Sequence, residues 1–292
     1  MMQLDKTQIA IRERGLLEIY DLALLVTKCY WKRILLSLAI FGIPVSLLNF
    51  FLLYSLQIEV GVWDVSAQFF TLTVVLIYLE APLVTVPLTM FLGDALFHDK
   101  PDWRRAFLGF WPLTPRVFWS ILMLRGVLPG IALVYFSMFE DGILAVVFLV
   151  LLCLYAVVLR VVRPYISEIV LLERNPLRSK NKSVITIGRR SSALHGPNFG
   201  DMVVRGMASS VSILIVLAIV LNIWAARGYL FGAWGIDLWY LNLLLPLGLW
   251  LVVAFMSVVR FLSYLDLRIR REGWEVELVV RAEANRWKGV LS

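Results

Sequence analysis

Two opposite charges, Glu80 and Arg125, stand inside long apolar stretches of the sequence. A charge near the centre of a lipid bilayer costs about 2.5–3.5 kcal/mol on insertion scales, so each needs a partner or a water-filled cavity. Their depths in two adjacent stretches differ by about 7 Å at 1.5 Å per residue, which an arginine side chain can cover. Two interpretations follow: a substrate- or proton-handling pair in a transport pathway, or an intramembrane ion pair that fixes helix packing. We favour the second.

A second group of polar residues lies in segment 174–201, which is rich in Asn, Ser, Gly and basic residues. Cations beside a membrane attract anionic lipid headgroups by roughly 1 kcal/mol each, which is sufficient to explain the group. A phosphoryl-group site or a surface for an acidic protein partner is the alternative, but no Gly-rich loop followed by Lys-Ser or Lys-Thr is present. We therefore predict lipid or partner binding by this segment. The residues are Arg178, Lys180, Lys182, Arg189 and Arg190.

Recognisable signatures of catalysis are missing from the sequence. The patterns His-Glu-x-x-His and Gly-x-Ser-x-Gly are absent, and two His and two dispersed Cys residues are too few for a His- or Cys-based metal centre. Neither His falls in an apolar stretch, which argues against an intramembrane Ser-His hydrolase. We therefore predict a protein that is not an enzyme and has no cofactor or metal.

The elements that must position these residues are membrane-spanning helices. The chain has 292 residues, 60% of them hydrophobic, and a mean hydropathy of +0.81, which exceeds the apolar share of soluble domains. Six apolar segments are each near the roughly 20 residues that cross about 30 Å of hydrocarbon. We predict a single all-α membrane domain (1–292) of six spans arranged as three hairpins. The spans are 34–56, 67–92, 117–138, 143–159, 207–226 and 238–259.

The distribution of basic residues predicts the orientation. Of the 28 Lys and Arg residues, all but Arg125 and Arg227 fall in the termini and in every second connection. The positive-inside rule then places both termini in the cytoplasm. The net charge of +7 follows from the same bias and requires no nucleic-acid partner.

Amphipathic segments flank the spans. Segment 1–33 contains a predicted helix at 16–33, which either lies in the headgroup plane, the arrangement we favour, or packs across the ends of the bundle. The tail at 260–292 has apolar positions at helical spacing up to residue 286, with acidic and basic residues in balance. Because anionic headgroups repel acidic side chains, this balance favours protein contacts. The proposed contact residues of the tail are Asp266, Arg268, Arg270 and Arg271.

Three stretches carry a resemblance to a known family. They are LLERNPL at 171–177, followed by Arg190-Ser191 and Leu194-His195; 82–101 with Phe91-Leu92-Gly93; and YLDLRIRREGWE at 264–275. They resemble a group of uncharacterised bacterial multi-pass inner-membrane proteins, distantly similar to the membrane domain attached to some glycerophosphodiester phosphodiesterases. The phosphodiesterase chemistry belongs to a separate soluble domain with no counterpart here.

The resemblance implies a bacterial inner-membrane location, protein partners in the same membrane and a cytoplasmic AAA+ ATPase as a further partner. With the anionic lipids expected at the cytoplasmic face, this favours a non-catalytic structural or interaction subunit of an envelope assembly. The alternative is a transporter or lipid-handling protein that uses Glu80 and Arg125.

Overall fold

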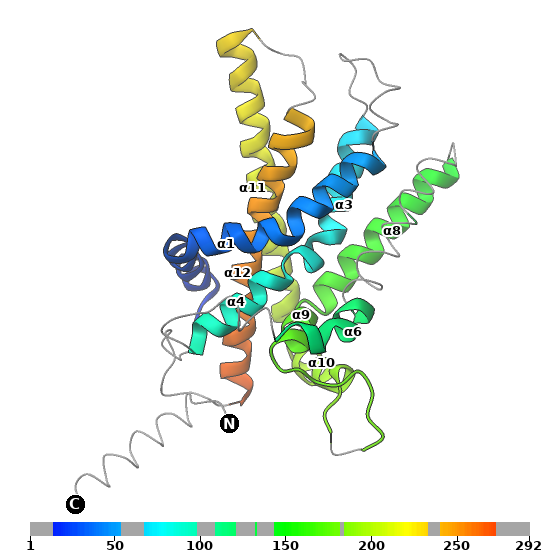
Figure 1. Ribbon diagram of the computed structural model, residues 1–292, viewed down its shortest axis with the longest axis vertical. Coiled ribbons are helices and arrows are strands. Elements are labelled where there is room, and N and C mark those ends of the chain that lie inside the picture. Colours follow the sequence, from blue (N-terminus) through cyan, green and yellow to red (C-terminus); the bar gives the residue numbers. More distant parts are fainter. Residues whose placement is uncertain are drawn as a thin grey trace, which may run out of the picture.

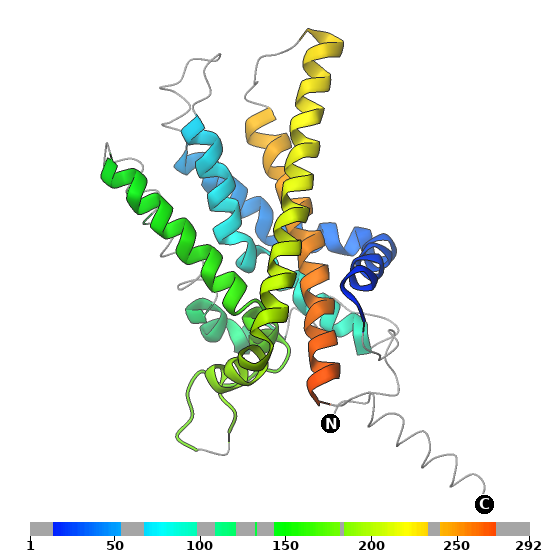
Figure 2. The same cartoon turned by 180° about the vertical axis from the view of Figure 1, so that it is seen from behind.

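The computed structural model describes residues 14–53, 67–97, 109–120, 132, 143–181, 184–232 and 240–272. Every regular element within these ranges is helical, as the sequence predicts (Figures 1 and 2). The longer helices are α1 (Leu16–Leu52), α3 (Ala67–Val84), α4 (Val86–Phe97), α8 (Ile143–Val162), α11 (Phe199–Phe231) and α12 (Leu245–Glu272). The short elements are η2 (Trp111–Leu113), α6 (Thr114–Val117), α9 (Ile166–Leu171), α10 (Ile187–His195), η4 (Gly196–Asn198) and the π-helical turn η5 (Tyr240–Leu244).

Three stretches of helix are long and apolar enough to cross a membrane: Leu16–Leu52, Leu72–Leu96 and Asn242–Arg271. They contain most of the first, second and sixth predicted spans and support a membrane protein. The fourth and fifth predicted spans fall in the helices α8 and α11. Most of the third, 117–138, lies outside the described residues, so six crossings and three hairpins stay a prediction.

The middle stretch, Leu72–Leu96, is interrupted at Thr85 and forms two helices, α3 and α4. The interruption lies between Pro82 and Pro87, which cannot donate the backbone hydrogen bonds that would continue the helix. In an apolar part of 18 residues within this stretch, 72% of the residues are buried, whereas the shares in the other two stretches are 28% and 33%. The broken helix is therefore the centre of the bundle, and the other two expose apolar side chains outward.

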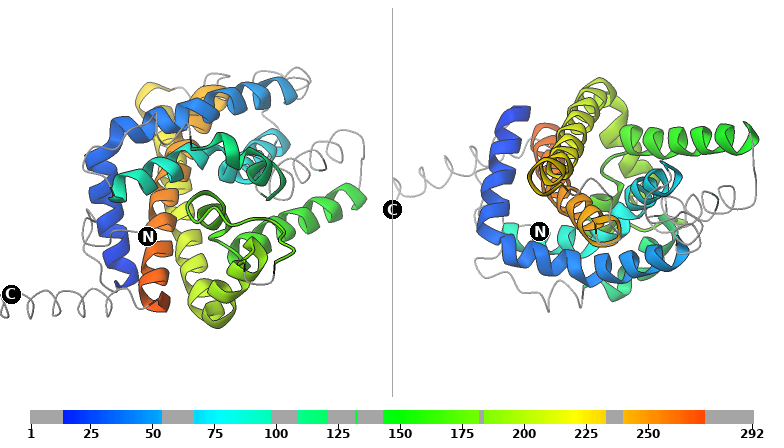
Figure 3. Two further views of the ribbon diagram at one scale, coloured as in Figure 1. Left: turned by 60° about the horizontal axis from the view of Figure 1, so that its bottom comes forward. Right: turned by 90° about the horizontal axis from the view of Figure 1, so that it is seen from above.

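The predicted amphipathic segment and the first span form one bent helix, α1. The backbone leaves the helical region at Tyr30, with φ −113° and ψ 17°, and the first half of α1 then lies across the bundle (Figures 1 and 3). The Tyr30 ring meets Phe91 edge-on, with 5.7 Å between ring centroids. Ile19 and Ala23 are fully buried on the inner face. This half therefore packs against the bundle through its inner face, and the choice between the two arrangements considered from the sequence stays a prediction.

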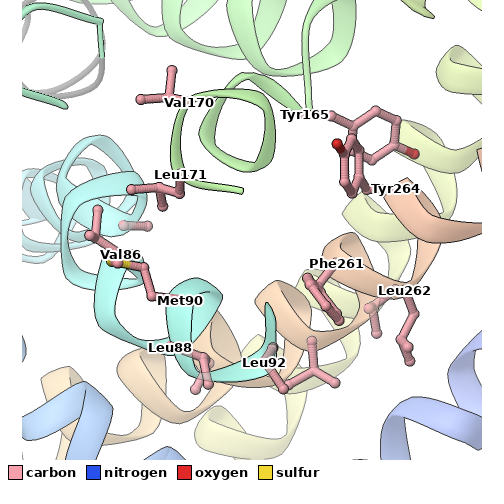
Figure 4. Close-up of a cluster of buried hydrophobic side chains, with 14 of the residues drawn as sticks. Val86, Leu88, Met90, Leu92, Tyr165, Val170, Leu171, Phe261, Leu262 and Tyr264 are labelled. Atoms are coloured by element: carbon pink, nitrogen blue, oxygen red, sulfur yellow. The ribbon is translucent and has the colours of Figure 1, made fainter. Parts of the chain in front are cut away.

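The main hydrophobic core lies where α4, α9 and α12 meet, with α1 alongside (Figure 4). Tyr264, Leu88 and Ile169 are among its fully buried side chains. α4 and the end of α9 approach very closely at Gly93. A Cβ atom added to Gly93 would lie only 2.4 Å from Cδ2 of Leu172. Gly93 allows this approach, and any larger residue there would force the Leu172 side chain to move.

Two segments that the sequence predicts to be cytoplasmic differ in structure from the expectation. Segment 174–201 is a loop only up to Thr186, because Ile187, Ser191 and Leu194 lie on one buried face of α10. Residues 260–272 are not a separate tail helix. They continue α12, since no Gly or Pro interrupts the chain between residues 249 and 272. Residues 273–292 lie outside the described residues.

Candidate functional site

Two buried carboxylates and a third that is partly buried gather where α9, α10, α11 and α12 meet. Glu168 lies on α9, Glu173 follows that helix, and Asp266 lies on α12, with side-chain exposures of 0%, 11% and 1%. A buried carboxylate is destabilising unless it is paired and hydrogen-bonded. Each of these three binds arginine. We call this group the carboxylate cluster, and its arginines are Arg190, Arg205, Arg260, Arg268 and Arg270.

Glu173 connects α10 with α12. Arg190 of α10 binds it bidentately, with Nε 2.6 Å from Oε2 and Nη2 2.8 Å from Oε1. The Tyr264 hydroxyl of α12 donates to Oε1 at 2.5 Å. Arg268 Nε lies 3.7 Å from Oε1 and its guanidinium stands over the Tyr264 ring. Bidentate pairing fixes the orientation of both groups as well as their distance.

Asp266 connects three distant parts of the chain. Its Oδ1 accepts the backbone N–H of Arg14 at 2.8 Å. Its Oδ2 accepts from Arg205 of α11 at 2.9 Å and lies 3.1 Å from Nε of Arg270. Burial acts to lower the pKa of Arg205, but the hydrogen bond to Asp266 and the surrounding negative charges outweigh it, and the net pKa is raised. Arg205 therefore stays charged.

The third carboxylate, Glu168, binds Arg260 of α12, whose Nε donates to Oε1 at 2.7 Å. The turn after α9 is held from another side, because Arg116 Nη1 donates to the backbone carbonyl of Arg174 at 2.5 Å. Arg174 has a φ of +56°, which is uncommon for a residue other than glycine. The cluster therefore ties α6, α9, α10, α11 and the end of α12 to the start of α1.

A buried Ser-His pair lies beside the cluster, but its hydrogen bonds do not suit catalysis. His195 Nε2 accepts the backbone N–H of Tyr165 at 3.3 Å, so its Nδ1 carries the proton and donates to the Ser191 carbonyl at 2.7 Å. Ser191 Oγ lies 3.2 Å from this Nδ1. With both ring nitrogens occupied, the imidazole cannot take the serine proton as a general base. The Tyr165 ring stacks on His195 at 5.7 Å.

Glu80 of α3 is hydrogen-bonded to α1. It accepts a hydrogen bond of 2.7 Å from Nδ2 of Asn49, on α1. Arg125 lies outside the described residues, so the Glu80–Arg125 pair stays a prediction.

Asn49 also lines a small pocket of about 20 Å³, together with Ser46 and Asn242 among others. Among the described residues, no group of three or more His, Cys, Asp and Glu side chains is placed to hold a metal ion.

The structure divides the predicted lipid- or partner-binding residues into two sets. Asp266, Arg190, Arg268 and Arg270 take part in the carboxylate cluster. The other predicted binding residues that the structure describes are exposed: Arg178, Lys180, Arg189 and Arg271. Lys182 lies outside the described residues.

Sequence reasoning did not select four members of the cluster as site residues. A signal for two of them is visible, because Glu168 and Arg260 each interrupt an apolar helical run. The other two are Glu173 and Arg205.

No protein-family model matches the chain, and neither does any curated protein or solved structure. The family resemblance therefore rests on the residues quoted for it. Some of those residues meet in space: Arg190 and Tyr264 both bind Glu173, and Leu172 packs against Gly93.

Proposed function

We propose that this protein is a non-catalytic structural or interaction subunit of a bacterial inner-membrane assembly, with six spans and both termini in the cytoplasm. The distribution of Lys and Arg supports the orientation. The family resemblance supports the compartment and the presence of protein partners, among them a cytoplasmic AAA+ ATPase.

The observation that supports this role most is that the charged groups of the carboxylate cluster bind one another. Glu168, Glu173 and Asp266 each pair with arginines of other elements. Charges that could bind or polarise a substrate therefore hold this end of the bundle together. The loop between α9 and α10 projects beyond it and carries the exposed Arg178 and Lys180 (Figure 1). A rigid bundle end with a basic loop is suited to docking a protein with an acidic surface.

Co-purification from native membranes in mild detergent tests this proposal. Truncation after Glu272 keeps Asp266 and Arg270, so the cluster stays intact while the remaining tail is removed. A matched variant replaces Arg178, Lys180 and Arg189 with Ser. We expect both variants to fold, and at least one to lose cytoplasmic proteins that the intact chain recovers. If both retain every partner, or if the intact chain recovers none, the docking role is wrong.

A transporter or lipid-handling protein is the second candidate, and one observation favours it. Asn49 is 6% exposed, and its buried Oδ1, beside the pocket, has no hydrogen-bond partner among the residues that the structure describes. The pocket has room for about one water molecule. Proton flux into proteoliposomes, followed with a pH-sensitive dye, tests this role. The flux should require Glu80 and be lost in Glu80→Gln, and no flux with the intact protein would reject the candidate.

A further inference from the structure

The first half of α1 exposes an apolar stripe on its outer side. Leu17 and Leu24 are spaced seven residues apart, which places them along one line of the helix, and Trp31 follows directly after the bend at Tyr30. Their exposed fractions are 79%, 59% and 52%. The inner face of the same half is formed by Ile19 and Ala23 and is fully buried. The stripe is therefore a second apolar face in addition to the one that packs on the bundle.

Basic residues accompany this stripe at the bend of α1. Lys28 and Lys32 are exposed and lie one step around the helix from the stripe. Lys32 Nζ is 5.5 Å from the centre of the Trp31 ring. The acidic residues Glu18 and Asp21 lie near the opposite end of this half. Positive charge is thus concentrated where the helix turns into the apolar stretch.

The bend also fixes where these residues lie relative to a membrane. The second half of α1 continues into the first span, and contact between Tyr30 and Phe91 holds the angle between the halves. Figure 3 shows the first half lying across the direction of the long helices. Trp is enriched at the membrane–water interface, and Lys side chains there extend to the headgroups.

We propose that the bend of α1 is a binding site for an anionic phospholipid. Leu17, Leu24 and Trp31 contact the acyl chains, and Lys28 and Lys32 bind the headgroup phosphate. Continuity with the span and the charge at the bend favour a lipid over a protein occupant. This site goes beyond the scaffold role and does not depend on it. Each lysine contributes about fivefold to lipid binding, so removal of both weakens it by more than tenfold.

Cys29 provides a local reporter, because it is exposed at this bend. The full chain carrying Cys153→Ser is labelled with bimane at Cys29 and placed in phosphatidylcholine nanodiscs. Spin-labelled phosphatidylglycerol or spin-labelled phosphatidylcholine is then added. We expect quenching by phosphatidylglycerol at a mole fraction at least tenfold lower than by phosphatidylcholine. Inorganic phosphate should not compete.

The matched variants separate charge from folding. Lys28→Gln with Lys32→Gln should abolish the preference for phosphatidylglycerol. Lys28→Arg with Lys32→Arg should retain it, and Asp21→Asn should not weaken it. Circular dichroism confirms that all three variants are folded. Equal quenching by the two lipids, an unchanged preference in the double Gln variant, or cross-linking between Cys29 residues of two copies would overturn the proposal.

Discussion

Asp266 shows how one buried carboxylate joins distant parts of this chain. It binds Arg205, 61 residues away, and the backbone of Arg14, 252 residues away. The sequence places Asp266 correctly on a helix, because apolar positions around it recur at helical spacing. It cannot reveal these partners, because helical periodicity carries information over a few turns only. Asp266, proposed from the sequence as a contact residue for a partner, thus connects distant parts of its own chain.

The first prediction compares the two carboxylates that bind Arg205. The Asp266 side chain is 1% exposed and that of Asp201 is 50% exposed. Asp266→Asn removes the buried carboxylate that binds Arg205 and leaves only the exposed Asp201; breaking a buried pair costs about 3–5 kcal/mol, whereas exposed pairs contribute up to about 1 kcal/mol. Thermal unfolding in detergent should therefore show a large loss of Tm for Asp266→Asn and a small one for Asp201→Asn. Equal losses would contradict a structural role for the cluster.

The second prediction concerns alkaline pH. Burial, with further contributions from the charges of Glu168, Asp201 and Asp266, raises the pKa of Tyr165 from its usual 10 to about 12. Above pH 10 the unfolded chain releases this proton and the folded chain keeps it. The free energy of unfolding therefore falls as pH rises from 10 to 12, by roughly 2–3 kcal/mol in total.

Tyr165→Phe keeps the ring that stacks on His195 but cannot titrate. Unfolding measured between pH 8 and pH 11 should thus show a shallower decline for this variant than for the intact chain. Parallel declines would show that Tyr165 does not contribute to the pH dependence.

At the scale of elements, the sequence predicts what periodicity and composition determine. The amphipathic start of α1 and the apolar stretches in α1, α3–α4 and α12 lie where they are expected. The bend at Tyr30 is not predictable in the same way. The proline within α1, Pro44, lies a long way from the bend, which is held by tertiary contact with Phe91. The nine-residue helix α10 is missed because its short apolar face is hidden among polar residues.

The third prediction tests the close approach of α4 to the end of α9. A Cβ at Gly93 would force the Leu172 side chain to move, and such overpacking costs about 1–3 kcal/mol. The control is Gly42→Ala, where the added Cβ would lie 3.5 Å from Val84, an ordinary contact. Both changes gain the same helix propensity, about 1 kcal/mol. The difference in Tm between the two variants therefore isolates the steric effect.

The combination of Gly93→Ala with Leu172→Val completes this test. Shortening Leu172 should recover part of the lost Tm, so the double variant should be more stable than the sum of the single effects predicts. Strict additivity would mean that the two positions do not interact.

The whole molecule has an ordered polar end and a long apolar part. The carboxylate cluster, α9 and α10 gather at the end of the bundle to which α12 descends, and the long helices extend away from it (Figures 1 and 2). The Lys and Arg distribution predicts that the polar end is cytoplasmic. It cannot predict that five of the arginines at this end pair with the carboxylates of the cluster, because pairing depends on which helices become neighbours.

The last prediction tests this orientation. Helix α11 has 33 residues and is about 50 Å long, more than the hydrocarbon core of a bilayer, so its two ends should lie on opposite sides. Tyr229, near its end, is 80% exposed, and Lys180 is exposed in the loop that precedes α10. In a background carrying Cys29→Ser and Cys153→Ser, an impermeant maleimide should label Tyr229→Cys in intact spheroplasts. It should label Lys180→Cys only after permeabilisation, because the two positions flank a helix that crosses the bilayer. The reverse pattern would invert the topology, and equal protection of both positions would show that α11 does not cross.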